Sequence, residues 1–315
     1  MNVRRPHISG AALAAVAVLG IGSLSACSTD SAAADGRFDV VASFYPMQFL
    51  AERIGGDHVH VTTLTEPGQE PHELELSLRQ RAELEESDAA LYLSGLQPSV
   101  DEAIDQAGLK AKIDAAHLTR LEDHGDVEHD HGGEEHPEEE EHSLDPHVWL
   151  DPVKYAEIAE GVGTAFAKAD PDHAADYRKN TDALVDRLHA LDTKFRDGLK
   201  NTKTKVFFTN HASFGYFAER YGLTQEAISG VDPESEPSPA RIRELREEAR
   251  ADGVTTVFYE TLVSGKTAKT LADDAGLRTD VLDPLEGLTD RSKGDDYFAV
   301  MEANLTALKK ALGAR

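Results

Sequence analysis

The sequence predicts an α/β protein of two lobes, each a parallel sheet flanked by helices, bridged by one long rigid α-helix. Strand-like segments rich in β-branched and aromatic residues alternate with helical segments in both halves of the chain. A long amphipathic pattern with no strand in it separates the halves. Such alternation implies parallel strands joined by right-handed crossovers. A chain of 315 residues is long enough to give each lobe its own core.

The N-terminus has the pattern of an export signal. A basic pair precedes an apolar run over residues 8–21, and small residues lead up to Cys27, the only cysteine. Because this ending resembles a bacterial lipobox, we predict that residues 1–26 are a signal peptide removed before a lipidated Cys27. The alternative, an uncleaved membrane anchor, is disfavoured by the short run. Residues 27–37 would be a flexible tether that holds an exported protein to the extracytoplasmic face of the cell membrane.

The net charge of −26 argues against a nucleic-acid partner, whose phosphates would be repelled. Part of this charge is local, because residues 122–142 carry eleven acidic residues and no lysine or arginine. This tract has no apolar periodicity, and we expect it to form a mobile surface loop.

The first lobe is predicted over residues 38–170. Its expected strands are 38–44, 58–64 and 89–94. Its expected helices are 45–54, a segment that ends near 86, 100–107 and 152–168, with a further short segment around Ile113. Gly55-Gly56 should stop the first helix, and Asp151-Pro152 should start the last, as an aspartate N-cap followed by proline.

A linking helix is predicted over residues 171–203, with its apolar stripe reaching to about Leu199. The second lobe follows over residues 204–315. Its expected strands are 205–210, 254–259 and 279–282. Its expected helices are 214–221, 239–251, 265–275 and 295–312.

Three histidines and one glutamate each lie after the end of a predicted strand. His72 follows the strand that ends at Leu64, and His147 lies in the long loop after the strand 89–94. His211 ends the first strand of the second lobe, and Glu286 follows the last one. Carboxyl ends of parallel strands are where open α/β sheets bind ligands. Two side chains from each lobe should therefore meet in the cleft between the lobes.

Short motifs occur in a fixed order along nearly the whole mature chain. They are Ser43-Phe44-Tyr45-Pro46, Ile54-Gly55-Gly56-Asp57, Gly68-Gln69-Glu70-Pro71-His72-Glu73-Leu74-Glu75, Asp145-Pro146-His147-Val148-Trp149-Leu150-Asp151-Pro152, Asn210-His211-Ala212-Ser213-Phe214-Gly215-Tyr216 and Leu282-Asp283-Pro284-Leu285-Glu286. In these motifs the chain resembles the metal-specific solute-binding proteins of bacterial ABC importers for zinc and manganese. The resemblance implies one metal ion at the interface of two lobes, and delivery to a membrane permease driven by an ATPase. We expect a monomer.

Three imidazoles and one carboxylate suit Zn²⁺ in tetrahedral geometry. Mn²⁺ prefers more oxygen ligands, and manganese-type members of the family replace one imidazole by a second carboxylate. His211 occupies that place here, so we predict zinc, with a manganese-binding homologue as the alternative.

The fourth ligand position has three candidates. Glu286 is our choice, Asp283 is the rival, and water fills the position in some family members. Aspartate before proline commonly organises a turn, so Asp283 could have that role and not be a metal ligand. Glu70 and Glu75 flank His72 and are predicted either to orient it or to remain solvated.

The acidic tract also contains a set of histidines: His124, His129, His131, His136 and His142. Imidazoles beside carboxylates would collect zinc with low affinity near the cleft, and protons would compete near pH 6 to 6.5. We expect this collector to be dispensable for tight binding.

Two other classes of function share these features. A zinc hydrolase would also use three histidines, but it would keep an open coordination position, and the sequence contains no HExxH motif. A surface adhesin or metal buffer would use the same fold and site without a permease. We therefore predict a binding protein and not an enzyme.

Overall fold

The computed structural model describes residues 36–124 and 144–314. The predicted signal peptide, Cys27, most of the tether and four of the five tract histidines lie outside these residues. Within the described ranges, no helix is both long enough and apolar enough to cross a membrane.

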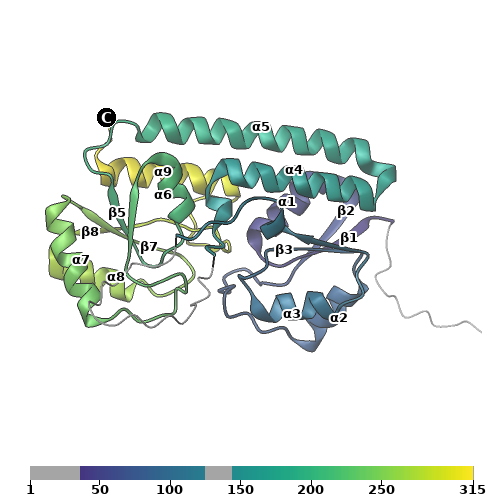
Figure 1. Ribbon diagram of the computed structural model, residues 1–315, viewed down its shortest axis with the longest axis horizontal. Helices are drawn as coiled ribbons and strands as arrows, with labels where there is room; N and C mark the ends of the chain where they lie inside the picture. The colour runs from purple at the N-terminus through teal and green to yellow at the C-terminus, as the bar shows by residue number, and fades with distance from the viewer. Residues whose placement is uncertain (1–35, 125–143, 315) are drawn as a thin grey trace, which may run out of the picture. The chain divides into compact units, whose positions relative to one another are not determined.

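The first lobe is built on a four-stranded parallel sheet of strand order β2-β1-β3-β4. Its strands are β1 (Phe38–Ala42), β2 (Val59–Thr63), β3 (Ala89–Tyr92) and β4 (Ala111–Asp114). Helix α1 covers one face and helices α2 and α3 cover the other (Figure 1). These helices are α1 (Tyr45–Gly55), α2 (Leu78–Glu86) and α3 (Pro98–Gln106).

The second lobe repeats this plan with strand order β6-β5-β7-β8. Its strands are β5 (Val206–Thr209), β6 (Thr224–Ala227), β7 (Thr256–Tyr259) and β8 (Arg278–Val281). Its helices are α6 (Gly215–Tyr221), α7 (Pro239–Ala251), α8 (Lys266–Ala275) and α9 (Tyr297–Leu312). The two predicted parallel sheets are thus confirmed.

Two of these strands differ from the sequence prediction. The short segment around Ile113 is strand β4, and β6 lies where no strand was predicted. Both are edge strands of four residues, and the Thr-Gln-Glu-Ala sequence of β6 shows neither an apolar run nor alternation. Backbone pairing with β5 therefore defines β6, rather than a pattern of buried side chains.

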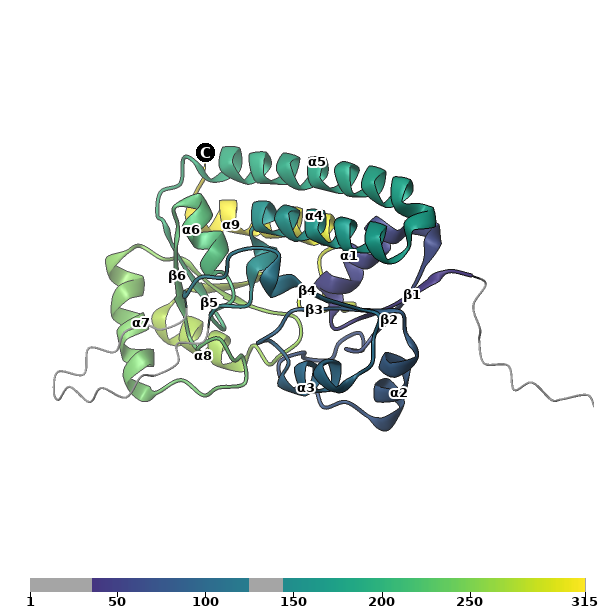
Figure 2. The ribbon, with the colours of Figure 1, turned by 45° about the vertical axis from the view of Figure 1, so that its right-hand side comes forward.

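Helix α5 (Ala174–Leu199) is the predicted linking helix, 26 residues long, and it follows a 3₁₀ turn at Pro171–His173. At about 1.5 Å per residue it is roughly 39 Å long. It runs beside α4 (Pro152–Ala169) and over α6 and α9 of the second lobe, in both views (Figures 1 and 2).

One continuous hydrophobic core connects the lobes through these helices. It includes Phe44 of the first lobe, Leu188 and Phe195 of α5, and Phe207 and Tyr297 of the second lobe. Smaller clusters fill the opposite face of each sheet. The predicted start of α4 is confirmed, because the Asp151 side chain accepts a hydrogen bond from the Val153 amide.

Candidate metal centre

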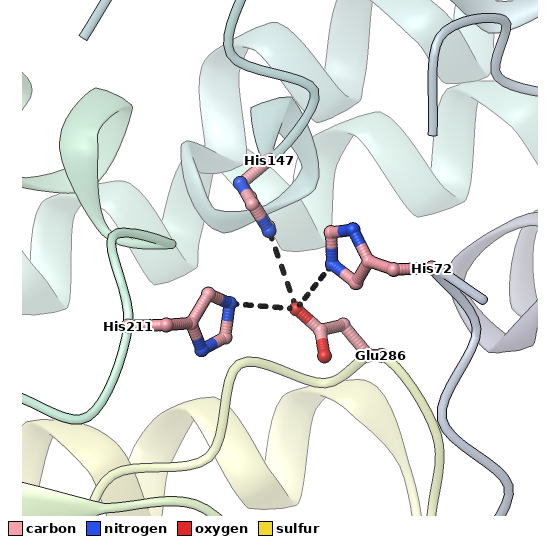
Figure 3. Close-up of side chains that lie close together, drawn as sticks. All are labelled: His72, His147, His211 and Glu286. Atoms are coloured by element: carbon pink, nitrogen blue, oxygen red, sulfur yellow. Dashed lines mark ion pairs between the residues drawn. The ribbon is translucent and has the colours of Figure 1, made fainter. Parts of the chain in front are cut away.

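The four predicted site residues come together, each from a segment that follows a strand. His72 lies between β2 and α2, His211 lies two residues after the end of β5, and Glu286 follows β8. His147 follows β4, and not β3 as the sequence analysis held, because the segment around Ile113 is a strand. Figure 3 shows the three imidazole rings pointing at the Glu286 carboxylate.

The Nε2 atoms of the three imidazoles converge on one carboxylate oxygen. The distance to Glu286 Oε1 is 3.5 Å from His72, 3.3 Å from His147 and 3.2 Å from His211 (Figure 3). The ring centroids are 5.4 to 6.0 Å apart. One ligand atom from each residue lies within 4.8 Å of all the others, which is the spacing of a group that can hold one metal ion.

The converging atoms are buried and have no hydrogen-bond partner in the described part of the chain. His147 and Glu286 are fully buried, His211 is nearly so, and His72 is one-tenth exposed. The three Nε2 atoms and both Glu286 oxygens are unsatisfied in the described chain. Buried polar atoms are normally paired, so this cluster fits a cation at its centre.

Two buried carboxylates orient the imidazoles from behind. Asp145 Oδ1 lies 2.7 Å from His147 Nδ1 and accepts the His147 backbone amide at 2.9 Å. Glu260 Oε1 lies 2.9 Å from His211 Nδ1. A carboxylate on Nδ1 places the proton there and leaves the Nε2 lone pair for a metal.

These two orienting roles were missed in the sequence. The sequence analysis names Asp145 only within the motif around His147, although its spacing of two from His147 lets one carboxylate reach both ring and backbone. Glu260 directly follows β7, at the same sheet edge as His211, so the strand-end argument could have identified it.

The other carboxylates near the cluster make different contacts. Asp283 accepts hydrogen bonds from the Leu285 amide at 2.9 Å, from Thr261 at 3.2 Å and from Ser292 at 2.8 Å. It therefore organises the turn that presents Glu286, in which Leu285 has a φ of 60°. The structure places Asp283 outside the ligand group.

Glu70 lies beside the His72 ring, with 3.9 Å between its Oε1 atom and His72 Nε2, whereas Glu75 takes the solvated alternative. The Glu70 side chain accepts the backbone amides of His72 at 3.1 Å and Glu73 at 3.2 Å, so it shapes the loop. Glu75 is exposed, and no contact of its side chain is seen among the described residues.

Electrostatics within the cluster favour an ionised carboxylate. Burial raises the pKa of Glu286, but His211, His147 and His72 outweigh it and hold that pKa well below its usual range. Burial lowers the pKa of His211, but Glu260 and Glu286 raise it well above the ordinary value. The pKa of His147 is likewise raised, by Asp145 and Glu286 against burial.

A pair of hydrogen bonds joins the His147 segment to the second lobe. Trp149 Nε1 donates to the Pro284 carbonyl at 2.7 Å, two residues from Glu286. The Tyr297 hydroxyl donates to the Trp149 carbonyl, also at 2.7 Å. Ligands from different lobes are thus held at fixed spacing by buried contacts.

Of the tract histidines, only His124 lies within the described residues. It is outside the four-residue group and contacts Asp145 and Glu219 instead. His129, His131, His136 and His142 lie in the range 125–143, which the structure does not describe.

Comparison with known proteins gives concordant matches. Residues 40–311 match the family model "Zinc-uptake complex component A periplasmic" (ZnuA). The zinc-binding lipoprotein AdcA of Streptococcus pneumoniae is 38% identical over 297 residues, covering 91% of this chain and 58% of that protein. The high-affinity zinc uptake system protein ZnuA of Bacillus subtilis is 34% identical over 300 residues, covering 92% of this chain and 93% of that protein.

Among solved structures, the Zn(II)-bound ZnuA-like domain of Streptococcus pneumoniae AdcA matches with a TM-score of 0.73 at 35% identity. The match covers 88% of this chain and 99% of that domain. This chain therefore spans 58% of the length of the AdcA relative, the part that includes its ZnuA-like domain. The family model and the relatives described here carry zinc-binding or zinc-uptake names, which agrees with the predicted zinc-binding protein.

Proposed function

Because the chain belongs to the ZnuA family of periplasmic zinc-uptake components, we propose that it is the extracytoplasmic zinc-binding component of an ABC importer. It captures Zn²⁺ between its lobes through His72, His147, His211 and Glu286 and delivers it to a membrane permease driven by an ATPase. The cargo is bound and released, and no covalent bond of a substrate is made or broken.

One observation carries this proposal: the three Nε2 atoms and the Glu286 carboxylate converge, buried, with no hydrogen-bond partner among residues 36–124 and 144–314. Three imidazole nitrogens and one carboxylate oxygen make a complete tetrahedral set for zinc. Asp145 and Glu260 supply the outer carboxylates that metal-ligating histidines usually have. The zinc-binding names of the relatives support the same cargo.

The same donor set argues against the alternatives. Manganese prefers oxygen-rich sites, and among the described residues the ligand group has a single carboxylate. A zinc hydrolase keeps one coordination position open, and Glu286 would fill it here. A surface adhesin or metal buffer would have the same site and differ only in its partner, so transport must be tested in cells.

The membrane anchor is a separate part of the proposal. Lipid on Cys27 would hold the protein at the extracytoplasmic face, next to its permease. Two relatives that are named as lipoproteins support this location at the membrane. The histidines of the tract would raise the local zinc concentration without contributing to tight binding.

A competitive titration of zinc and manganese tests the binding claim. The chain from Cys27, with Cys27→Ser, should bind one zinc ion tightly and manganese more weakly. His211→Ala should abolish tight binding, and Glu286→Gln should weaken it. His189→Ala, at an exposed position on α5, is the matched control and should bind like the parent. Tighter binding of manganese, or unchanged affinity in both site variants, would refute the assignment.

Zinc uptake by cells tests the transport claim. Zinc-limited cells that lack the protein should regain uptake with the natural chain, and should fail to do so with His211→Ala. Cys27→Ser should reduce uptake while leaving zinc affinity unchanged. Uptake restored fully by His211→Ala would show that the protein acts as something other than an importer component.

A further inference from the structure

Helix α6 of the second lobe contacts the first-lobe segment that begins with Asp145, carries His147 and ends with Asp151. The Tyr216 hydroxyl donates to the Asp145 carbonyl at 2.8 Å. Arg220 Nε lies 3.1 Å from Asp151 Oδ1. Because Tyr216 and Arg220 are four residues apart on α6, they lie on one face of the helix. That face therefore holds the segment on both sides of His147.

Arg220 connects three elements through its ion pairs. Its Nε lies 2.7 Å from Oδ1 of Asp192 on α5, in addition to its contact with Asp151, the N-cap of α4. Asp151 and Asp192 are both buried. Burial raises the pKa of Asp151, and the Val153 amide and the Arg220 charge oppose this rise. A buried carboxylate that loses its cation is strongly destabilised, so Arg220 fixes the start of α4 against α5 and α6.

The backbone between Asp151 and His147 is a closed 3₁₀ turn. The Asp151 amide donates to the Val148 carbonyl at 3.2 Å, and the Leu150 amide donates to the His147 carbonyl at 3.3 Å. The three residues of the turn, including Trp149, are fully buried. A displacement at Asp151 is therefore transmitted to the backbone of His147.

The opposite end of α6 is joined to His211. The helix begins at Gly215, four residues after His211, and the Ser213 amide donates to the His211 carbonyl at 3.0 Å in the turn between them. Gln225 Nε2 donates to the same carbonyl, also at 3.0 Å. A Cβ at Gly215 would lie only 2.7 Å from Asp145 Oδ2, so the start of α6 also lies against the first lobe. One short helix thus connects two ligands that come from different lobes.

We propose that Tyr216 and Arg220, the α6 clamp, are positioning residues for zinc binding. They fix the distance between His147 and His211 and thereby the zinc affinity of the buried centre, so this inference rests on the proposed function. Neither side chain belongs to the ligand group. Zinc–nitrogen bonds of about 2.0–2.1 Å tolerate little displacement of a ligand. Without the clamp, zinc would have to order the two segments itself, and that cost would appear as lost affinity.

Three variants of the chain from Cys27, with Cys27→Ser, test the α6 clamp by competition with a chelator for zinc. Tyr216→Phe removes only the hydroxyl, and Arg220→Lys keeps the charge but loses the Nε donor. Each should weaken zinc binding by about tenfold. Arg241→Lys is the matched control, because Arg241 is a buried arginine whose Nη2 lies 2.7 Å from Glu226 of the same lobe. It should lower the denaturant midpoint of the metal-free protein but keep the zinc affinity.

Cobalt absorption separates a positioning role from a loss of stability. Four-coordinate Co²⁺ in a tetrahedral site absorbs visible light much more strongly than Co²⁺ with additional water ligands. In the Co²⁺-loaded protein, Tyr216→Phe and Arg220→Lys should each give a weaker and shifted visible band, whereas Arg241→Lys should give the band of the parent.

Two results would overturn the α6 clamp. One is a parent that binds zinc tightly while Tyr216→Phe and Arg220→Lys both keep its zinc affinity and Co²⁺ spectrum. The other is an Arg241→Lys variant that weakens zinc binding as much as they do. A parent without tight zinc binding would instead refute the proposed function, so the two failures can be distinguished.

Discussion

At the scale of single residues, Asp145 and Glu260 determine which nitrogen of His147 and His211 faces the centre of the cluster. Each carboxylate lies within 2.9 Å of an Nδ1 atom and is itself buried. A free imidazole has two tautomers and can rotate, and both freedoms would weaken a metal site. The ligands thus depend on partners that do not touch the metal.

Replacement of the Glu260 carboxylate by an amide tests this dependence. Glu260→Gln keeps the shape of the side chain but removes the charge that favours the Nδ1 proton of His211. Zinc affinity should fall by about 10- to 100-fold, measured by competition with a chelator. Glu247→Gln, at an exposed position on α7, should leave the affinity unchanged. Unchanged zinc affinity in Glu260→Gln would show that Glu260 does not orient His211 for metal binding.

Zinc affinity should fall as the pH falls, because protons and the metal compete for the same Nε2 atoms. The pKa values of His147 and His211 are raised in the metal-free protein, so at pH 7 zinc binding should release protons. Calorimetry in two buffers of different ionisation enthalpy measures this release. Equal observed enthalpies in the two buffers would contradict the prediction.

The stability of the metal-free protein should change with pH in the opposite direction to zinc affinity, and should fall as the pH rises. A histidine whose pKa is raised by folding stabilises the protein fully below its unfolded pKa of about 6.5. That contribution is lost as the pH rises through the folded pKa. The melting temperature of the metal-free protein should therefore decrease above pH 6.5, whereas that of the zinc-loaded protein should not. A melting temperature of the metal-free protein that rises over this pH range would contradict the prediction.

The site residues could be predicted because strand ends mark one edge of a parallel sheet. His211 and Glu286 follow their strands closely, and His72 lies in the loop after its strand, so the sequence pattern places them. The role of Asp283 could not be decided from sequence, since an Asp-Pro pair suits both a ligand and a turn. Its hydrogen bonds with Leu285 and Ser292 show that Asp283 organises the turn.

At the scale of elements, the segment between His147 and α4 connects the lobes. The Trp149 indole donates to the Pro284 carbonyl in the turn that carries Glu286. Tyr155 of α4 makes a comparable bond at 2.6 Å, but to Pro46 of α1 in the same lobe. Two similar buried hydrogen bonds therefore differ in whether they join the lobes.

This difference allows a matched comparison. Trp149→Phe and Tyr155→Phe each leave a buried carbonyl without its donor, and each should lower the free energy of unfolding by at least about 1 kcal/mol. Only Trp149→Phe should also weaken zinc binding, by the order of tenfold, because it loosens the Glu286 turn against His147. Denaturant unfolding and zinc titration of both variants check this. Equal zinc affinities would show that the interlobe bond is structural alone.

The strands with an apolar or alternating pattern were predicted, and two of the four edge strands, β4 and β6, were not. In β1 and β3 the apolar run is nearly continuous, as expected for strands buried on both faces. β6 is polar and partly exposed, and pairing with β5 alone makes it a strand. The missed strand β4 also explains why His147 was assigned to the wrong strand.

At the scale of the whole molecule, α5 and α4 tie both lobes into one packed body. The two helices pack closely at Gly163 of α4, where a Cβ would overlap the Thr181 side chain of α5. The core that includes Leu188 and Phe195 continues from one lobe into the other. Such a body resists a wide hinge motion, because bending it would expose packed apolar surface.

We therefore expect zinc binding to change the loops more than the angle between the lobes. Small-angle scattering of metal-free and zinc-loaded protein should give the same radius of gyration within error. The local change should appear in hydrogen exchange of the segments around His72 and Glu286. A clear decrease in the radius of gyration on zinc binding would show a hinge closure that this packing does not predict.

Anomalous diffraction at the zinc edge tests the central claim most directly. In crystals of the zinc-loaded protein, the strongest peak should be bonded to the Nε2 atoms of His72, His147 and His211 and to the Glu286 carboxylate. The zinc–nitrogen distances should be about 2.0–2.1 Å. A strongest peak elsewhere, or one that lacks any of these four residues, would contradict the assignment of the zinc site.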